Sequence, residues 1–479
     1  MSANRREFLL GAAVVAAGAP LSPLARMVAE APWPNSSASP FLLETSSGGL
    51  TSLKFAGDLF PTNYVAAGQR LGHIDITWRR GTVPWKQFRS EDLALGEVTL
   101  LPVSGGGTGA EYRVKDDAGE ALAVRVKLQP DGGVLRWTLS LRNLGTSPIE
   151  VGDLALPLPM HSSFDAKEPP TASVLKHSFI SGHGSYLFWM RSNSVGPYLV
   201  LTPGHATQLE YWDHSPAQPK QAQRQRPVFR AYIHSAAVAE TIQAEGGRWR
   251  QPHTKLTLPP GEEKVYGLEL AWAQDYSAVR DHLVNAGLLD VDVAPGMTVP
   301  SDLSVCVAIR SKTSILELLP EHPEQTTIKP IGERDGRKLY RVKFSRLGEN
   351  MLTVRQPDDR LTRLEFFATE PVETLLHKRA AFITKHQVND ANKWYNGLLA
   401  EWAMDTRVQL GPDNYDRIKS WRVYEVTCDD PGLSKPAYLA SKNAEFPDPA
   451  QVQALDDYIE HFVWGGLQRT TDEKYSYGI

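Results

Sequence analysis

The chain has 479 residues with a formal net charge of −4, and 42% of its residues are hydrophobic while 22% are charged. These values are typical of a globular protein of about two to four domains. No basic run is long enough for a nucleic-acid-binding surface, so that class of function is excluded. The two cysteines, Cys306 and Cys428, lie far apart and form no CxxC motif, so we predict no metal site and no cofactor.

Residues 1–32 predict an export signal. Arg5 and Arg6 precede an uncharged apolar run from Phe8 to Ala19, a pattern that resembles a bacterial twin-arginine (Tat) signal. The run is too short to span a bilayer as a permanent anchor. We therefore expect a periplasmic or extracellular protein that is exported already folded and has no membrane anchor. The alternative is a basic N-terminus that arose by chance.

Residues 38–273 predict a large antiparallel β-sandwich with no helix. Leu135, Trp137, Leu139 and Leu141 alternate with polar residues, as on a strand that buries one face. The segment 122–129 alternates in the same way. Between the two runs, Pro130-Asp131-Gly132-Gly133 supplies the fixed φ of proline and the positive φ of glycine, so we expect a hairpin.

The next strand contains a change of phase. Its alternation begins at Ile149 and Val151 and then continues, one residue out of step, from Leu154. We expect a β-bulge at Gly152-Asp153 to absorb this shift. Because proline cannot donate a ladder hydrogen bond, the two prolines of 157–159 predict that the strand leaves its sheet or runs along an edge there.

Residues 274–292 predict a connector helix, which we expect to span Asp275–Gly287. Residues 293–369 then predict a small β-sandwich of immunoglobulin-like size. Its expected strands are Leu303–Ala308, Ser314–Leu318, Lys338–Phe344 and Asn350–Val354.

Residues 370–479 predict an all-helical segment. We expect Thr369 to cap a first helix, Trp394–Met404 to form a second, and 447–449 to open a third that ends at Gly465-Gly466. The apolar stripe expected on the third helix consists of Val452, Leu455, Ile459, Phe462 and Val463.

A family resemblance organises these elements. The segment LRNLGTSPIEVGDLALPLP resembles the galactose-mutarotase-type supersandwich at the N-terminus of many carbohydrate-active enzymes. The segments GGLTSLKFAGDLFPTNYV, CDDPGLSKPAYLASKN and YIEHFVWGGLQ are similar to a family of uncharacterised bacterial and fungal proteins related to six-hairpin glycosidases. The resemblance covers nearly the whole chain after the signal. It implies a fold that is mainly β followed by α: a β-supersandwich, a small immunoglobulin-like sandwich, and the start of an (α/α)6 helical barrel.

The resemblance also implies a carbohydrate substrate, and glycoside hydrolysis normally needs two carboxyl groups. Our candidates for catalysis are Asp429 and Asp430, on a loop that Pro431-Gly432 would hold in a turn. Repulsion between adjacent carboxylates tends to raise one pKa, as a general acid requires. The alternative is that Asp before Pro-Gly simply forms a turn or a helix cap.

Five more residues are candidates for binding substrate. Tyr424, Lys435 and Asn443 flank the same loop and could bind sugar hydroxyls or a carboxylate, unless they are ordinary solvent-facing residues. Trp394 and Trp402 could stack on a pyranose ring, unless they belong to the core.

Three histidines of the sandwich are candidates by resemblance alone. His177, His183 and His214 resemble the histidine-rich surface of a true mutarotase. No carboxylate partner can be assigned to any of them, so we interpret them as structural.

Three functions remain open. We favour the N-terminal part of an exported glycoside hydrolase that acts on a poly- or oligosaccharide. A polysaccharide lyase would use Tyr424 and Lys435 instead of Asp429, and a non-catalytic sugar-binding module would use neither. The helical segment has room for about four or five helices, far fewer than a six-hairpin barrel needs. We therefore expect a complementary C-terminal helical-barrel polypeptide as a partner, unless these helices fold back on the sandwiches.

Overall fold

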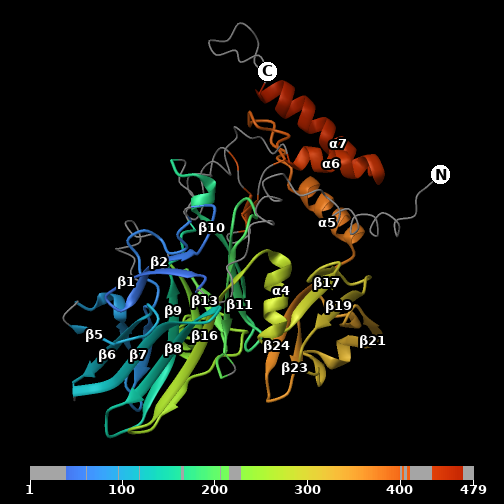
Figure 1. Cartoon of the computed structure of the whole chain (residues 1–479). Coiled ribbons are helices and arrows are strands. Elements are labelled where there is room, and N and C mark those ends of the chain that lie inside the picture. Colours follow the sequence, from blue (N-terminus) through green and yellow to red (C-terminus); the bar gives the residue numbers. More distant parts are fainter. Residues whose placement is uncertain are drawn as a thin grey trace. The chain divides into compact units, whose positions relative to one another are not determined.

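The computed structural model describes residues 39–60, 62–94, 97–117, 119–162, 167–204, 206–214, 228–399, 402–403, 407–409, 411 and 434–467. The predicted export signal, residues 1–32, lies outside these residues. The chain divides into two compact units, one of residues 1–297, 305–342 and 350–366, the other of 298–304, 343–349 and 367–479. Strands dominate the sequence up to residue 369 and helices follow (Figure 1), so the predicted order of a mainly β part before an α part is confirmed.

Two antiparallel sheets form the large sandwich. One has eight strands in the order β10-β11-β12-β16-β8-β7-β6-β5, and the other has six, β13-β14-β9-β3-β4 with β15 paired to β9. The strands of the eight-stranded sheet are β5 (Thr99–Leu100), β6 (Thr108–Asp116), β7 (Gly119–Asp131), β8 (Val134–Asn143), β10 (Val174–Phe179), β11 (Tyr186–Arg191), β12 (Tyr198–Pro203) and β16 (Glu263–Ala273). Those of the six-stranded sheet are β3 (Asp75–Arg79), β4 (Lys86–Arg89), β9 (Ile149–Leu158), β13 (Tyr211–Asp213), β14 (Phe229–Ser235) and β15 (Leu256–Leu258). A separate hairpin joins β1 (Phe41–Ser46) to β2 (Gly49–Phe55).

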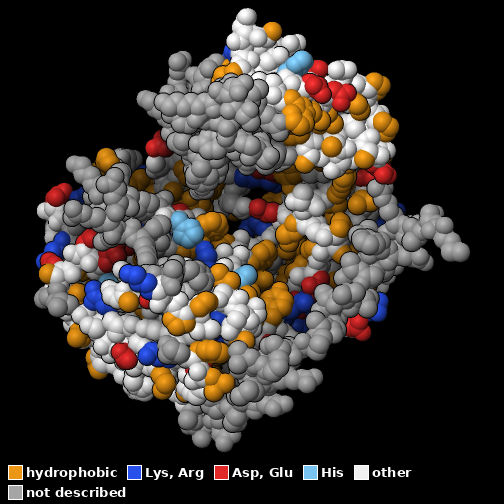
Figure 2. Space-filling view, turned by 90° about the horizontal axis from the view of Figure 1, so that it is seen from above, with side chains coloured by type: hydrophobic (Ala, Val, Ile, Leu, Met, Phe, Trp, Pro, Cys, Tyr) orange, Lys and Arg blue, Asp and Glu red, His pale blue; other side chains and the backbone are white. Residues whose placement is uncertain are grey.

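The core of the sandwich lies between the two sheets. The four alternating residues of β8 (Leu135, Trp137, Leu139 and Leu141) are fully buried there, as predicted. The expected hairpin is also confirmed, because β7 and β8 pair from Leu122 opposite Asn143 to Asp131 opposite Val134. On the visible outer surface, positive and negative side chains are interspersed with hydrophobic ones (Figure 2).

The change of phase in β9 is a β-bulge, as predicted. Thr77 of β3 pairs with Asp153, but the next residue, Trp78, pairs with Val151, so Gly152 is an extra residue on β9. Beyond Ala155, the ladder between β3 and β9 stops while the ladder with β14 continues to Leu158. Pro157 therefore lies where one side of β9 has lost its strand neighbour, as its missing N–H donor requires.

Among the described residues, the α-helices α3 and α4 accompany the large sandwich. The helix α3 (Ala236–Ala244) contradicts the expectation that residues 38–273 contain no helix. The residue that precedes this helix, Ser235, makes no side-chain capping hydrogen bond, so the local sequence does not predict the start of the helix. The expected helix at 275–287 is confirmed as α4 (Tyr276–Asn285), with Asp275 accepting the N–H of Ala278. It ends well before residue 292, since β17 begins at Asp290.

Two four-stranded sheets form the small sandwich, in the orders β17-β19-β22-β21 and β18-β24-β23-β20. Its strands are β17 (Asp290–Ala294), β18 (Thr298–Pro300), β19 (Val305–Arg310), β20 (Glu317–Pro320), β21 (Thr326–Arg334), β22 (Arg337–Phe344), β23 (Gly348–Arg355) and β24 (Leu361–Thr369). Four of these strands were predicted, whereas β17, β18, β21 and β24 were not. The strand β21 shows no alternation in sequence because most of its side chains are exposed on both faces.

The described residues after 369 include the helices α5 (Val372–Lys385), α6 (Ser434–Glu445) and α7 (Pro449–Asp457), and α7 continues in π-helical geometry over Tyr458–Leu467. Asp448 caps α7 by accepting the N–H groups of Ala450 and Gln451, as the start signal at 447–449 predicted. No helix among the described residues is long and apolar enough to cross a membrane.

Two details of the predicted helical segment are wrong. Thr369 ends β24 and caps nothing, since its Oγ1 donates to the carbonyl of Glu370 and α5 begins after Pro371. The expected helix at 394–404 is absent from the described residues: Gly397 takes a φ of +81° and turns the chain, and a short strand, β25, lies at 402–403. The left-handed φ of glycine is incompatible with a continuing helix.

The predicted stripe on α7 is also displaced. Val452 and Ile459 are exposed, whereas Phe462 is buried and Leu455 and Val463 are partly buried. The residues that face inward instead are Gln451, Ala454, Tyr458 and Phe462. A buried glutamine gave no apolar signal, so the sequence pattern selected the neighbouring face.

The bulge provides a test of the packing around β9. A Cβ atom at Gly152 would lie 2.7 Å from Cη2 of Trp85 and 2.8 Å from Cβ of Ala237. We expect Gly152→Ala to lower the free energy of unfolding by about 1–3 kcal/mol, because overpacking forces its neighbours apart. Urea denaturation would measure the change. The control is Gly267→Ala in β16, where the added Cβ meets nothing within 4 Å; equal stability of the two variants would contradict the close packing.

Candidate functional site

Only some of the predicted site residues can be placed. Asp429, Asp430 and Tyr424 lie outside the described residues, and for Trp402 only the backbone, in β25, is described. The catalytic and binding roles assigned to these four residues therefore stay predictions.

Lys435 and Asn443 both lie in α6, which begins at Ser434. Lys435 is only 4% exposed, and burial lowers the pKa of its ammonium group to about 8. Asn443 donates to the Leu439 carbonyl (2.8 Å) and to Oε1 of Gln451 (3.2 Å), and its own Oδ1 accepts the N–H of Asp448 (2.8 Å). These bonds hold α6 to the start of α7, and a role in sugar binding stays a prediction for both residues.

Trp394 is the predicted binding residue with most free surface. Its side chain is half exposed, while its ring lies 6.2 Å from that of Phe462 and 5.6 Å from that of Tyr395. One part of the indole thus packs on the helical core and another part remains open to a ligand.

The three sandwich histidines have separate surroundings. Nδ1 of His183 accepts the N–H of Leu361 at 3.4 Å, and His214 packs against the rings of Trp212 and Phe229. The ring of His177 stacks on Phe188. They share no common partner in these contacts.

A pocket with charged walls lies on the six-stranded sheet, and we call it the aspartate pocket. Its volume is about 270 Å³. It is lined by Asp75, Ile76, Thr77, Trp85, Gln87, Phe88, Arg89, Asp153, Ala155, Asp213, Arg230, Tyr232, Ala237, Val238 and Thr241. This size is close to the lower end of the range for small-molecule sites, about 300–1,000 Å³.

The polar residues of the pocket face away from the sandwich core because of strand alternation. Ile76 and Trp78 of β3 are in the core, so Asp75 and Thr77 point outward. On β14, the core residues Phe229 and Ala231 leave Arg230 and Tyr232 on the outer face. On β9 the bulge gives Asp153 the same outward direction.

Arg230 lies between two carboxylates in the pocket. Its Nε donates to Oδ2 of Asp75 at 2.8 Å, and its Nη1 lies 3.9 Å from Oδ1 of Asp213. The hydroxyl of Tyr232 donates to the other oxygen of Asp213, at 2.7 Å. Burial raises the pKa of Asp75, and the Arg230 guanidinium opposes that shift.

Two oxygen atoms of this cluster are buried without a hydrogen-bond donor among the described residues. Oδ1 of Asp75 and Oδ1 of Asp213 are buried, and neither accepts a hydrogen bond from a residue that the structure describes. A buried polar atom without a partner is unfavourable. Both atoms lie below the accessible surface, so a ligand in the pocket would meet the other polar groups of its lining.

Asp153 has a different role. Its Oδ1 accepts the N–H groups of Ala237 and Val238, both at 3.0 Å, so it caps α3 from another strand. Burial raises the pKa of this carboxyl to about 6. Asp153 therefore holds α3 over the pocket instead of presenting a free carboxylate to it.

The polar lining of the pocket suits a ligand that carries several hydroxyl groups. Trp85 provides an aromatic wall, fixed by its Nε1 bond to Oε2 of Glu240 (2.8 Å) and by the Arg79 guanidinium 3.8 Å above its ring. The described residues contain no cluster of His, Cys, Asp and Glu that could hold a metal ion.

Comparison with known proteins gives the family. The chain belongs to a family of unknown function, DUF5695, whose model matches residues 50–479. No curated protein matches the chain.

Solved structures resemble the chain in fold. Polysaccharide lyase BACCELL_00875 shares 17% sequence identity with a TM-score of 0.69, over 91% of this chain and 61% of the lyase. A putative aldose 1-epimerase from Escherichia coli K12 shares 11% identity with a TM-score of 0.30, over 50% of this chain and 97% of that one. A galactose mutarotase-related enzyme from Lactobacillus acidophilus shares 8% identity with a TM-score of 0.33, over 51% and 97%.

This chain spans about three fifths of the lyase's length. The similarity establishes a scaffold like that of carbohydrate-active enzymes. The predicted relation to six-hairpin glycosidases is not confirmed by these comparisons and stays a prediction.

Sequence reasoning missed the aspartate pocket because its residues are scattered. Asp75, Asp153, Asp213 and Arg230 come from four strands, and each looks like an ordinary polar residue of an alternating strand. One signal was present: the change of phase at Gly152-Asp153 marked a place where the strand re-aims a side chain.

Lys435 provides a test of whether its role is structural. Because its pKa is about 8 when folded and ordinarily 10.5, protonation favours the unfolded chain below pH 10.5. We expect the free energy of unfolding of wild type to rise, relative to that of Lys435→Met, by about 1–3 kcal/mol between pH 8 and pH 10.5.

Urea denaturation at several pH values would measure this difference. Lys338→Met, on β22, is the control. A Lys435→Met variant with unchanged stability but lost saccharide affinity would instead assign the lysine to substrate.

Proposed function

We propose that this chain is the N-terminal part of an exported enzyme that degrades a poly- or oligosaccharide, and that the aspartate pocket holds one sugar unit. The observation that carries the proposal is the likeness in fold, over 91% of this chain, to a polysaccharide lyase. The pocket adds a chemical argument. Sugar hydroxyls can bond to the polar side chains that line the pocket, while the ring packs on Trp85.

Hydrolysis is our first candidate for the reaction. Water would cleave the glycosidic bond with one carboxyl as general acid and another as base or nucleophile. Asp429 and Asp430 are the residues we propose for these roles. The carboxyl groups that line the pocket favour a neutral sugar as the ligand, and a hydrolase can act on a neutral sugar.

β-Elimination by a polysaccharide lyase is the second candidate, and the name of the similar solved structure favours it. A lyase removes a proton next to a uronate carboxylate, so it needs a cation or amide to neutralise that group. Tyr424 and Lys435 would serve as base and cation. The burial of Lys435 in α6 weighs against this assignment, because its ammonium group is almost inaccessible.

The helical part is proposed to be the beginning of an (α/α)6 barrel, completed by further helices or by a separate helical polypeptide. Large apolar side chains on α5 and on the helix that begins with α7 support this idea. The exposed ones are Val372, Leu375, Val452, Ile459 and Trp464. Exposed apolar residues on neighbouring helical turns are the kind of surface that another helix covers.

Export by a Tat-type route is proposed from Arg5 and Arg6. Replacing both with lysine should retain the protein in the cytoplasm, whereas the wild-type protein should reach the periplasm or the medium. Cell fractionation with immunoblotting would measure the distribution. Replacement of Arg26 by lysine is the control, and export of the double variant at the wild-type level would contradict the proposal.

The reaction can be identified from its products. The protein would be incubated with neutral polysaccharides and with polyuronates. New reducing ends without ultraviolet absorption indicate hydrolysis, while an unsaturated product that absorbs in the ultraviolet indicates β-elimination. Binding without either product would leave a non-catalytic sugar-binding module.

The pocket is tested by Asp213→Asn. The amide keeps an oxygen to accept from Tyr232 but replaces one acceptor with a donor, so the fold should persist while affinity for a neutral saccharide falls about tenfold or more. Isothermal titration calorimetry would measure the affinity. Asp131→Asn, at the exposed end of β7, is the matched control. Equal affinities of the Asp213 variant and wild type would remove the pocket from the proposal.

A further inference from the structure

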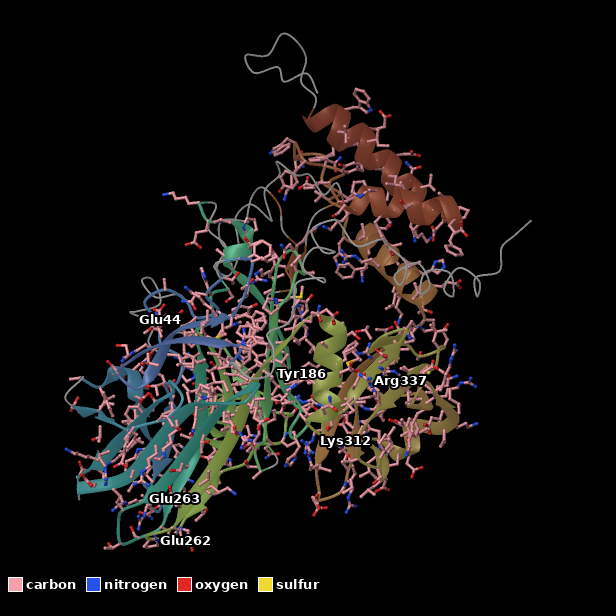
Figure 3. All side chains as sticks on the ribbon, in the orientation of Figure 1. Glu44, Tyr186, Glu262, Glu263, Lys312 and Arg337 are labelled. Atoms are coloured by element: carbon pink, nitrogen blue, oxygen red, sulfur yellow. The ribbon has the colours of Figure 1, made fainter. Side chains whose placement is uncertain are left out.

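A second and larger hollow lies on the other side of the large sandwich, and we call it the aromatic groove. Its volume is about 560 Å³. It is lined by His177, Ser178, Phe179, Tyr186, Phe188, Met190, Ser194, Tyr198 and Tyr276. In Figure 3, Tyr186 lies beside α4, the helix that contributes Tyr276 to the groove.

The groove and the aspartate pocket face in opposite directions. Leu187 and Trp189 of β11 are in the core between the sheets, so Tyr186 and Phe188 point to the outer face of the eight-stranded sheet. The aspartate pocket lies on the outer face of the six-stranded sheet. The two hollows are therefore separated by the whole thickness of the sandwich.

Aromatic rings cross three neighbouring strands of the groove in a ladder. The ring of His177 on β10 stacks on Phe188 of β11 at 4.5 Å with 9° between the planes. Phe188 is parallel to Tyr198 of β12, at 6.1 Å and 2°. Phe188 and Tyr198 are buried and form the floor, whereas His177 is exposed at the rim. This arrangement fixes the rings in place before any ligand arrives.

The described residues that line the groove include polar groups but no Lys, Arg, Asp or Glu. Burial raises the pKa of Tyr186 to about 12 and lowers that of His177, so both are neutral at pH 7. The hydroxyl of Tyr198 donates to the carbonyl of Ser194 at 2.9 Å, which leaves the hydroxyls of Tyr186, Ser178 and Tyr276 as hydrogen-bonding groups for a ligand.

We propose that the aromatic groove is a second saccharide-binding site, selective for neutral pyranose units over uronates. Aromatic rings bury the apolar face of a pyranose, and hydroxyl groups around them bond to its rim. An uncharged lining offers nothing to compensate the desolvation of a carboxylate. The choice of a saccharide as ligand rests on the proposed function. The site would hold a stretch of polymer away from the aspartate pocket and so raise the affinity of the protein for long chains.

Tyr276 is the residue to change. It is 51% exposed at the start of α4, so its truncation should not disturb the core. We expect Tyr276→Ala to weaken binding of neutral hexasaccharides by about tenfold. Tyr276→Phe should stay within about threefold of wild type, because it keeps the ring. Phe367→Ala is the matched control, since Phe367 is 50% exposed and lies outside the groove.

Affinity electrophoresis and calorimetry with gluco-, manno- and galacto-hexasaccharides and with an oligogalacturonate would decide. Loss of neutral binding in Tyr276→Ala, with Phe367→Ala unaffected and little dependence on salt, supports the groove. Wild-type affinity of Tyr276→Ala together with weakened binding by Asp213→Asn overturns the groove but leaves the proposed function intact. Binding of the oligogalacturonate alone, weakened by salt, also overturns it. Absence of any saccharide binding by wild type overturns both proposals.

Discussion

The extra residue at Gly152 is the constraint on which the aspartate pocket depends. If Gly152 paired regularly instead of forming a bulge, Asp153 would share the face of Val151 and enter the core, and Leu154 would point to solvent. With the bulge, Leu154 is buried while Asp153 points outward to the N-terminus of α3. Gly152 also leaves room for Trp85 and Ala237, where any Cβ would collide. One residue therefore sets the phase of β9, the position of α3 and a wall of the pocket.

Strand alternation made much of the β part predictable. The hairpin of β7 and β8 and the bulge in β9 follow from a period of two, because each strand buries one face against a continuous core. The same reasoning failed where burial does not follow that pattern. The exposed strand β21 shows no period, and α3 receives its cap from Asp153, more than eighty residues earlier in sequence. On α7 the buried residue Gln451 is polar, so the apolar pattern in the sequence did not mark the face that is buried.

The candidate sites were less predictable than the fold for a related reason. A hollow on a sheet is assembled from alternate residues of strands that are distant in sequence. Arg230, for example, meets Asp75 across 155 positions. The order of strands β13-β14-β9-β3 brings them together, and that order cannot be read from a single sequence. The aromatic groove also escaped notice, although His177 was a candidate, because its partners Phe188 and Tyr198 resembled core residues of buried strands.

The charges of the two hollows together bear on the choice between hydrolysis and β-elimination. Elimination proceeds only if a positive or amide group neutralises the uronate carboxylate. In the aspartate pocket, three carboxyl groups accompany two guanidinium groups, and Arg230 is already bonded to Asp75. A uronate there would meet Asp75 and Asp213 at close range, a repulsion that water could not screen in a half-enclosed site. The described residues that line the aromatic groove include no charged side chain. If both hollows bind saccharide as we propose, the charges of their described linings favour a neutral polymer over a uronate.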